Sequence, residues 1–466
     1  MISRVKLGLL ALSTFFAFSS TGFSQQEETP VQQKSLAVTV YNANLGVVKD
    51  TRTLKIASGR SEIAIRDVAQ LIDPTSVHIK LDGEVIEQNY QYDLVSAAKI
   101  LQKYIDKPVQ LISDKGEALE GKLLSASDQI VLQKKEGGLI MIPNLTNYRI
   151  SVGSLPEGLI TRPTLIWTVD SKSAKNQDVE ISYQTGGMNW HAEYVAVLND
   201  NDTKLDLNSW VSIMNESGTT YNDAELKLVA GDVNLVSQRN QMPLRKDMAY
   251  AQEQAGAPQF QEKEFFEYHI YNLQRPATLN NNETKQISLF QAENVNITKK
   301  FLYKGGIGSY YPMGQGGQKQ KVSVAVEFEN KSANNLGMPM PKGKVRLYKS
   351  DGKTIEFIGE DMIDHTPRDE RVKLKIGDAF DIAVEDIQTD NKRISDRVYD
   401  QSYEITFRNR KKEDIVIEVE RYLGLNWEIL SSSIDYQKKD AQNILFKVPV
   451  AKNGETKLKF SVRYSY

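Results

Sequence analysis

Apolar and polar residues alternate along most of this 466-residue chain, and this pattern limits the fold more than any other feature. In the last stretch every second residue is apolar: Leu458, Phe460, Val462 and Tyr464. Successive side chains of a strand point to opposite faces, so the alternation predicts strands with one buried face. Asp351-Gly352 offers a hairpin turn between two such segments. We therefore predict a mainly β protein composed of tandem β-sandwich-like domains.

One segment departs from this alternation and predicts a helix. Apolar residues recur there at spacings of three and four: Leu94, Ala97, Ala98, Leu101 and Ile105. Asp93 can cap the start of this helix, and Pro108 ends it. Five short alternating segments follow between residues 109 and 152. A helix leading into five curved strands is similar to an Sm-like or SH3-like small barrel. Because no basic face carries aromatic residues, we interpret this unit as an inserted spacer or interaction module rather than an RNA-binding domain.

The first 24 residues have the composition of an export signal. Arg4 and Lys6 provide a short positive region, and an uncharged, largely apolar run follows. Gly22 and Ser24 then place small residues before a cleavage point at Gln25. The apolar run is shorter than the roughly 20 residues that a membrane-spanning helix needs. We therefore expect a periplasmic or secreted protein that does not span a membrane after signal removal and associates with the outer membrane only through partners.

The chain contains no cysteine, which excludes disulfides, a lipid on an N-terminal cysteine and zinc sites built from cysteines. The stability of an exported protein without disulfides must come from an ordinary hydrophobic core, and 466 residues are enough for two to four domains. A net charge of −2 with 25% charged residues gives no reason to expect nucleic acid as a partner.

Changes in composition and periodicity divide the chain into successive segments. They are a signal peptide (1–24), a flexible leader (25–35), an N-terminal β-domain (36–91), the helix with its small five-strand barrel (92–152), a core β-domain (153–237), a mobile linker or loop (238–264) and a C-terminal β-sandwich region (265–466). The linker is predicted from its richness in Gln, Ala and Glu and its lack of a clear period.

Recognisable catalytic motifs do not occur in this sequence. The four histidines are far apart in the chain and none belongs to a His-Glu-x-x-His pair: His78, His191, His269 and His365. His191-Ala192-Glu193 matches one half of a deaminase signature, but the other half needs cysteines. We therefore interpret His191 as a structural residue. No P-loop, dinucleotide-binding motif or G-x-S-x-G elbow is present. We assign no catalytic, cofactor-binding or metal-binding residue, and we expect no cofactor.

Three clusters of polar residues are best explained as turns. Residues 199–208 gather acidic and amide oxygens that could hold calcium, but Lys204 stands where an EF-hand needs an oxygen ligand. Residues 408–412 are basic, and we interpret them as a solvated hairpin tip. The third cluster combines glycines with small polar residues and predicts a tight bend and a turn between strands: Gly186, Gly187, Asn215, Ser217 and Gly218.

Several longer phrases carry a family resemblance. They include "VTVYNANLGVVKDTR", "GLITRPTLIW", "ISYQTGGMNWHAEYVAVL", "SWVSIMNESGTTYNDAELKLVAGDVN", "EYHIYNLQRPATLNNNETKQISLF" and "RNRKKEDIVIEVE". In these phrases the sequence resembles the exported domain family of unknown function numbered 4139, which is related to mucoidy-inhibitor-like proteins. The resemblance extends over nearly the whole chain after the signal. It implies an exported, β-rich protein and supplies no catalytic residues.

From these features we expect a non-enzymatic exported protein of the cell envelope that acts as a scaffold or protein-binding partner. An alternative is a protein that binds carbohydrate or peptidoglycan, with Tyr310 and Tyr311 stacking on sugar rings. A hydrolase whose site is assembled from distant residues is a further alternative, because such a site leaves no local motif. The expected partner is thus an envelope protein, and the alternative ligand is a glycan.

Overall fold

The computed structural model describes residues 32–465 apart from positions 128, 232, 235–258, 307–319, 351–352 and 425. This described part contains six open sheets and one α-helix, so the prediction of a mainly β protein is confirmed. No helix within it is long and apolar enough to cross a membrane.

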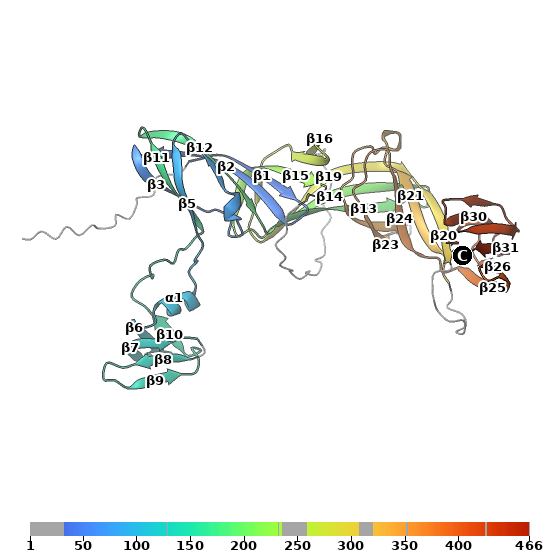
Figure 1. Cartoon of the computed structure of the whole chain (residues 1–466). Coiled ribbons are helices and arrows are strands. Elements are labelled where there is room, and N and C mark those ends of the chain that lie inside the picture. The colour runs from blue at the N-terminus through green and yellow to red at the C-terminus, as the bar shows by residue number, and fades with distance from the viewer. Residues whose placement is uncertain are drawn as a thin grey trace, which may run out of the picture.

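Two sheets form one end of the molecule (Figure 1). The larger has the strand order β16-β17-β15-β1-β2-β12-β4, with β18 paired to β15. Its strands are β1 (Gln32–Tyr41), β2 (Leu45–Ile56), β4 (His78–Lys80), β12 (Lys175–Thr185), β15 (Tyr221–Ala230), β16 (Phe260–Phe265), β17 (Tyr268–Leu273) and β18 (Ala277–Leu279). The smaller has the order β3-β11-β5 and comprises β3 (Gly59–Arg66), β5 (Glu84–Gln91) and β11 (Thr164–Ser171), with the short 3-10 helix η1 (Pro74–Ser76) nearby in sequence.

Three further sheets continue the body towards the C-terminus (Figure 1). The order β19-β14-β13-β22-β23 joins β13 (Met188–Leu198), β14 (Lys204–Asn215), β19 (Glu283–Asn296), β22 (Gly343–Ser350) and β23 (Ile355–Ile363), and η2 (Ser332–Asn334) is a 3-10 turn. The order β24-β21-β20-β27-β30-β29 joins β20 (Thr298–Gly306), β21 (Ser323–Glu329), β24 (Arg371–Asp378), β27 (Ile415–Tyr422), β29 (Tyr436–Lys438) and β30 (Asn443–Val450). The order β25-β26-β31-β28 joins β25 (Ile382–Ser395), β26 (Val398–Asn409), β28 (Trp427–Ser432) and β31 (Glu455–Ser465).

Among the described strands, three parallel pairings connect segments that lie far apart in the sequence. They join β1 to β15, β13 to β22 and β20 to β27. Parallel neighbours cannot be joined by a tight hairpin, so each pairing requires a long excursion of the chain. These pairings link early and late parts of the sequence into one elongated body.

Within the described residues, the body has two hydrophobic cores. The first extends from Leu36 to Leu374 and contains Trp167 and Trp190, which are fully buried. The second extends from Phe301 to Tyr464 and draws residues from the last two sheets. The four apolar residues of β31 are all buried in it, so the alternation predicted for the last strand is confirmed.

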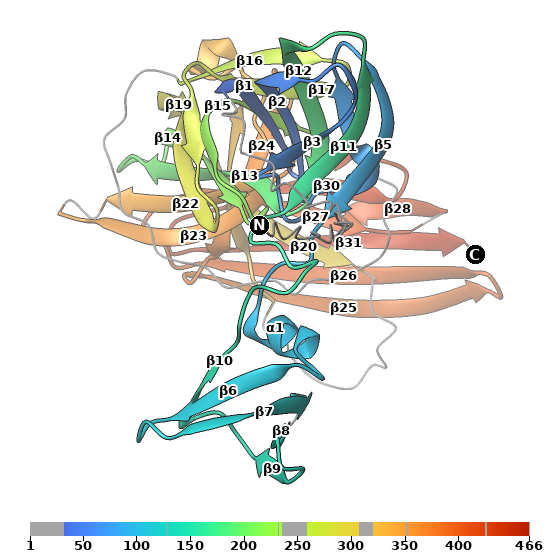
Figure 2. The same ribbon diagram turned by 90° about the vertical axis from the view of Figure 1, so that its left-hand side faces the viewer.

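The insert between β5 and β11 hangs away from the body in both views (Figures 1 and 2). It contains α1 (Ala97–Lys103), β6 (Pro108–Ser113), β7 (Ala118–Ser125), β8 (Ile130–Gln133), β9 (Leu139–Ile142) and β10 (Tyr148–Ser151). The helix and the five strands are thus confirmed, but the expected barrel is not closed. The strand order is β10-β6-β7-β8-β9, and no pairing between β9 and β10 occurs among the described residues. Strand β9 is only four residues long and is followed by Pro143, which has no N–H to extend the ladder.

Two local predictions need correction. Ser96, rather than Asp93, caps α1, because the Ser96 side chain accepts the N–H of Lys99. The chain at Leu94 is held in a bridge with Ile160 and cannot start the helix.

The second correction concerns the predicted linker 238–264, whose last residues form β16. Its polar composition hides a strand that is stabilised by pairing with β17. The remainder of the linker falls largely outside the described residues.

Candidate functional site

The two tyrosines predicted to contact a sugar, Tyr310 and Tyr311, lie outside the residues that the structure describes. The described surface offers a different candidate in the insert. This unit has a core of its own, formed by Tyr104, Val109, Leu111, Leu123, Ile130, Leu132 and Ile142. The Tyr104 hydroxyl donates to the Ser154 carbonyl at 2.7 Å and accepts the Ser154 N–H at 2.8 Å. These bonds tie the end of α1 to the chain that leaves the last strand.

Strand β9 is one of the two edge strands of the insert sheet, β10 being the other, and it carries exposed apolar side chains. It pairs only with β8 within the described part. Leu139 is 59% exposed and Met141 is 68% exposed, whereas Ile142 belongs to the insert core. Alternate residues share a face of a strand, so Leu139 and Met141 form an apolar row on the outward face. Edge strands are usually protected by charges or proline; the four residues of β9, LIMI, contain neither, and Pro143 lies just past the end of the strand.

A groove of about 750 Å³ lies on the strands next to this edge. Its lining includes Gln110, Glu120, Lys122 and Gln133. At Gly121 the floor of the groove is formed by backbone atoms. A side chain has no room there, because a Cβ atom would lie 2.8 Å from the Gln133 carbonyl oxygen. The lining also includes Pro108, Val109 and Val152, so the groove presents a mixture of polar and apolar groups on the strands beyond β8.

Charges of both signs border the groove. Lys122 Nζ lies 2.7 Å from Asp106 Oδ1, and Lys135 Nζ lies 3.9 Å from Glu120 Oε2. All four side chains are well exposed, so these pairs contribute little to stability and can exchange partners. A surface of this mixed character suits an extended polypeptide better than an apolar small molecule.

A buried carboxylate lies on the outward face of the sheet that contains β13. Glu193 Oε2 accepts hydrogen bonds from Ser212 Oγ at 3.0 Å and from Gln286 Nε2 at 2.8 Å. Glu193 Oε1 lies 3.6 Å from His191 Nε2 and 3.7 Å from Arg346 Nη1. These residues come from β13, β14, β19 and β22, so a single carboxylate links four strands.

The surroundings of Glu193 determine its charge. Burial raises the pKa of this carboxyl, whereas the contacts with His191, Ser212 and Arg346 lower it, and the resulting pKa is about 2. Glu193 is therefore an anion at neutral pH whose two oxygens are both held by neighbouring side chains. This arrangement stabilises the sheet and orients His191.

His269 and His365 lie in separate surroundings, and His78 lies on β4. His269 Nδ1 lies 2.8 Å from Glu262 Oε1, and His365 Nε2 lies 3.1 Å from Asn42 Nδ2. Among the residues that the structure describes, no three His, Asp or Glu side chains converge in a way that could hold a metal ion.

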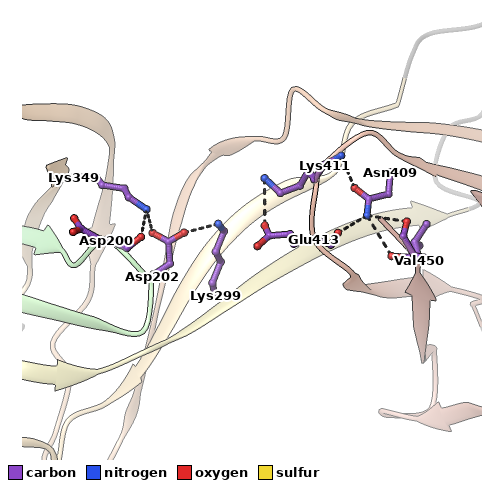
Figure 3. A network of polar contacts seen from close by, with 9 residues as sticks. Asp200, Asp202, Lys299, Lys349, Asn409, Lys411, Glu413 and Val450 are labelled. Atoms are coloured by element: carbon purple, nitrogen blue, oxygen red, sulfur yellow. Dashed lines mark hydrogen bonds and ion pairs between the residues drawn. The ribbon is translucent and has the colours of Figure 1, made fainter. Parts of the chain in front are cut away.

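Residues 199–208 form the turn between β13 and β14 and the start of β14, as predicted. The Asn199 side chain accepts two backbone N–H groups of this turn, at 2.9 and 3.1 Å. Asp202 is held by two lysines, with Lys299 Nζ at 2.6 Å and Lys349 on its other oxygen (Figure 3). These ammonium groups already neutralise the carboxylate that calcium would need.

Two of the four basic residues in segment 408–412 pair with acidic neighbours. Arg408 lies 2.7 Å from Glu385 and 3.1 Å from Glu455, and Lys411 lies 3.5 Å from Glu413 (Figure 3). The segment is therefore a turn after β26 in which Arg408 and Lys411 are charge-paired, whereas Arg410 and Lys412 are exposed.

A second groove, of about 470 Å³, lies on the last sheet. Hydroxyl groups dominate its lining, which includes Ser402, Ser431, Ser432, Ser433 and Ser461. Hydrogen bonds from Lys457 and Lys459 lower the pKa of Glu404 in the same groove. Such a lining can hydrogen-bond a polar ligand.

A family described as a domain of unknown function, DUF4139, matches residues 179–466, which is more than half of the chain. The chain belongs to the DUF4139 family. No curated protein matches the chain. The DUF4139 match includes the Glu193 network and the second groove, but not the insert. The resemblance of the phrases before residue 179 stays a prediction.

Corners of the DUF4139 region are built by glycines and buried asparagines. Gly187 has φ +72°, and a Cβ atom there would lie 2.6 Å from the Glu216 carbonyl oxygen. Asn215 Nδ2 donates to the Thr219 and Leu279 carbonyls, and its Oδ1 accepts the Ser217 hydroxyl. The predicted bend and turn are therefore confirmed as structural features.

Sequence reasoning missed the corner at Asn330, and it predicted the turn at 408–412 without a role for Asn409. Asn330 donates to the Met338 and Pro367 carbonyls and accepts the Gly337 N–H. Asn409 donates to three carbonyls and accepts the Lys411 N–H (Figure 3). The available signal was an asparagine at the end of a long alternating segment, followed by polar turn residues.

Proposed function

We propose that this protein is a non-enzymatic exported protein of the cell envelope that binds a partner protein through its insert. The observation that carries the proposal is the open edge of β9, with Leu139 and Met141 exposed near a groove of mixed polar and apolar lining. The partner would supply an extended segment that pairs with β9 as an additional strand. Backbone hydrogen bonds would then provide affinity, and the apolar row would provide specificity.

The attachment of the insert supports this use. Two chain segments connect it to the body, and Leu94 and Ile160 form a parallel bridge between them. The N–H of Val95 also donates to the Ile160 carbonyl at 2.9 Å. The insert thus has its own core, and its two connecting segments are bridged to each other where they leave the body. It presents the edge strand β9 away from the elongated body (Figure 1).

The finer architecture is part of the same proposal. We infer that the body consists of sandwich-like layers in tandem, which is supported by its two cores and successive sheets. We also infer that the insert is related to SH3-like small barrels, because its last strand returns beside its first. Export is inferred from the N-terminal signal composition.

Cross-linking in intact cells, followed by purification of the tagged protein and mass spectrometry, tests the proposed function. A stoichiometric envelope protein should be recovered with the wild type and reduced at least ~10-fold with Met141→Lys, because a buried unpaired charge costs several kcal/mol. Met362→Lys is the matched control, since Met362 is also exposed, at 56%, but lies on β23. Equal recovery of the partner with both variants would contradict the assignment of the binding surface to β9.

Glycan binding is the second candidate, favoured by the hydroxyl-lined groove on the last sheet. Retention of the protein on immobilised peptidoglycan or glycans would be compared with that of a Tyr310→Ala/Tyr311→Ala variant and a Glu404→Gln variant. Loss of retention with either variant would assign glycan binding to the surface that carries the substituted residues. No retention of the wild type would exclude glycan binding.

A further inference from the structure

The hairpin of β16 and β17 ends in an exposed aromatic tip. Phe265 pairs with Tyr268 in the register of the two strands, so Phe266 and Glu267 form a two-residue loop. Phe265 is 59% exposed and Phe266 is 79% exposed. We call Phe265 and Phe266 the aromatic tip.

The backbone of the tip is strained. Phe266 has φ +57°, a left-handed conformation that costs a bulky residue roughly 1–2 kcal/mol. Two-residue hairpin loops normally place Asn, Asp or Gly at such positions. The Phe266 ring lies 6.3 Å from that of Tyr268, and most of the Phe266 surface is in solvent. Folding alone would favour Asn or Gly here, so the aromatic side chain points to a binding role.

The rest of the hairpin is firmly anchored. Phe260 and Tyr271 are buried in the first core, and the Tyr271 hydroxyl donates to the Pro339 carbonyl at 2.9 Å. The Tyr268 ring packs so closely on Gly231 that a Cβ atom there would lie 2.4 Å from it. The aromatic tip is thus presented on a fixed support, which lowers the entropy lost on binding.

Acidic side chains surround the tip. Between positions 262 and 269 the chain carries Glu262, Glu264 and Glu267 against a single lysine, Lys263. Glu262 contacts His269, whereas Glu264 and Glu267 are exposed. This charge disfavours an anionic lipid surface and suits a protein pocket bordered by Lys or Arg.

We propose that the aromatic tip inserts into an apolar pocket of a partner protein whose rim is basic. The inference rests on the proposed protein-binding function but uses a surface separate from β9. Phe265 and Phe266 act as the buried anchors of the contact, and Glu264 and Glu267 pair with the rim. A second docking point on the body would fix the orientation of a partner held by the insert.

Photo-cross-linking in cells tests this proposal. Benzoylphenylalanine is placed at position 266, at position 141 as a probe of β9, and at position 380 as a control, since Phe380 is 99% exposed. Position 266 should give one discrete protein adduct, mapped to apolar residues next to Lys or Arg, and position 380 should give none. Glu264→Lys/Glu267→Lys should reduce the adduct at least ~10-fold.

The outcomes separate the two proposals. An adduct at 141 without one at 266 overturns the tip and leaves the proposed function intact, whereas no adduct at either position overturns both. An adduct insensitive to charge reversal overturns the basic rim. Flotation of the purified protein with neutral phosphatidylcholine vesicles that depends on Phe266 would replace the protein partner with a membrane.

A second variant makes use of the strain. Phe266→Asn relieves the left-handed conformation and should leave the melting temperature unchanged or raise it by about 1–2 °C. The same variant should reduce co-purification of the partner at least ~10-fold. A lower melting temperature with unchanged co-purification would show that Phe266 serves the fold and would overturn the proposal.

Discussion

Buried side chains at strand ends decide where this chain turns. Asn215, Asn330 and Asn409 are each almost fully buried. The side-chain amide of each hydrogen-bonds backbone groups of a corner. A buried corner would otherwise leave unpaired carbonyl and N–H groups, which are costly. Glu193 has a comparable role across strands, since its carboxylate accepts hydrogen bonds from Ser212 and Gln286 and lies close to His191 and Arg346.

The low pKa of Glu193 predicts a pH-dependent stability. Its pKa is about 2 in the folded protein, against an ordinary value of 4.5, so the unfolded chain binds the proton more tightly. The stabilisation is therefore fully present above pH ~4.5 and is lost as the pH falls towards 2. Glu193→Gln should lower the free energy of unfolding at pH 7 by about 2–3 kcal/mol and flatten its pH dependence in this window. Urea unfolding at pH 7 and pH 3 checks this, and parallel pH profiles of both proteins would contradict it.

Substitution of Gly187 should be destabilising for two reasons, its left-handed backbone and steric crowding. Gly116, which has a similar φ but no crowding, serves as the comparison. Gly187 and Gly116 both have positive φ, at +72° and +83°, but a Cβ atom at Gly116 meets nothing within 4 Å. Gly116→Ala should cost about 1 kcal/mol of stability, and Gly187→Ala should cost roughly 1–3 kcal/mol more, because its Cβ would collide with the Glu216 backbone. Equal losses in denaturant unfolding would argue against the close approach.

At the scale of elements, the insert is a separate unit whose two connections to the body are bridged to each other. Its core residues are all its own, and the Leu94–Ile160 bridge brings its two connections together. The strands on either side of it, β5 and β11, pair with each other in the body. The body therefore keeps its pairing partners without the insert.

Removal of the insert follows as a prediction. Residues 95–159 are replaced by a short Gly-Ser linker, which can span the distance between bridged neighbours. The body should fold with a melting temperature within about 2 °C of that of the full chain, since no body core residue is deleted. Thermal unfolding followed by circular dichroism checks this, and a body that fails to fold would show that the insert completes its core.

At the scale of the whole molecule, two cores follow one another along an elongated body (Figure 1). The second core encloses an ion pair. Arg421 Nη1 lies 2.5 Å from Asp386 Oδ2, and both side chains are about 5% exposed. Tyr303 donates to the same carboxylate at 2.9 Å, and the Arg421 guanidinium lies 4.5 Å from the centre of the Tyr403 ring.

Because this ion pair lies in the second core, its disruption should destabilise that core alone. Asp386→Leu leaves the buried charge of Arg421 uncompensated and should cost about 3–5 kcal/mol. Asp386→Leu/Arg421→Met removes both charges and should cost much less. Calorimetry should show the loss in the transition of the second core, with the first core unaffected. A double variant as unstable as the single one would refute the charge argument.

Much of the fold could be predicted because its signals are local. Alternation over a few residues indicated β31, the β22–β23 hairpin and the five strands of the insert, and turn residues indicated the corners at Gly187 and Asn215. The hairpin of β16 and β17 was missed in part, because a polar composition masked a strand that exists through its pairing.

The amino-acid sequence by itself determined which residues face a core and where the chain turns, since both depend on neighbours one to four positions away. Only the tertiary structure decided which strands pair, such as β1 with β15 and β13 with β22. It also decided that β9 is an open edge and that Glu193 meets Ser212, Gln286 and Arg346. A period of two residues fixes the face of a strand but not its partner, because strand pairing depends on contacts between distant parts of the chain.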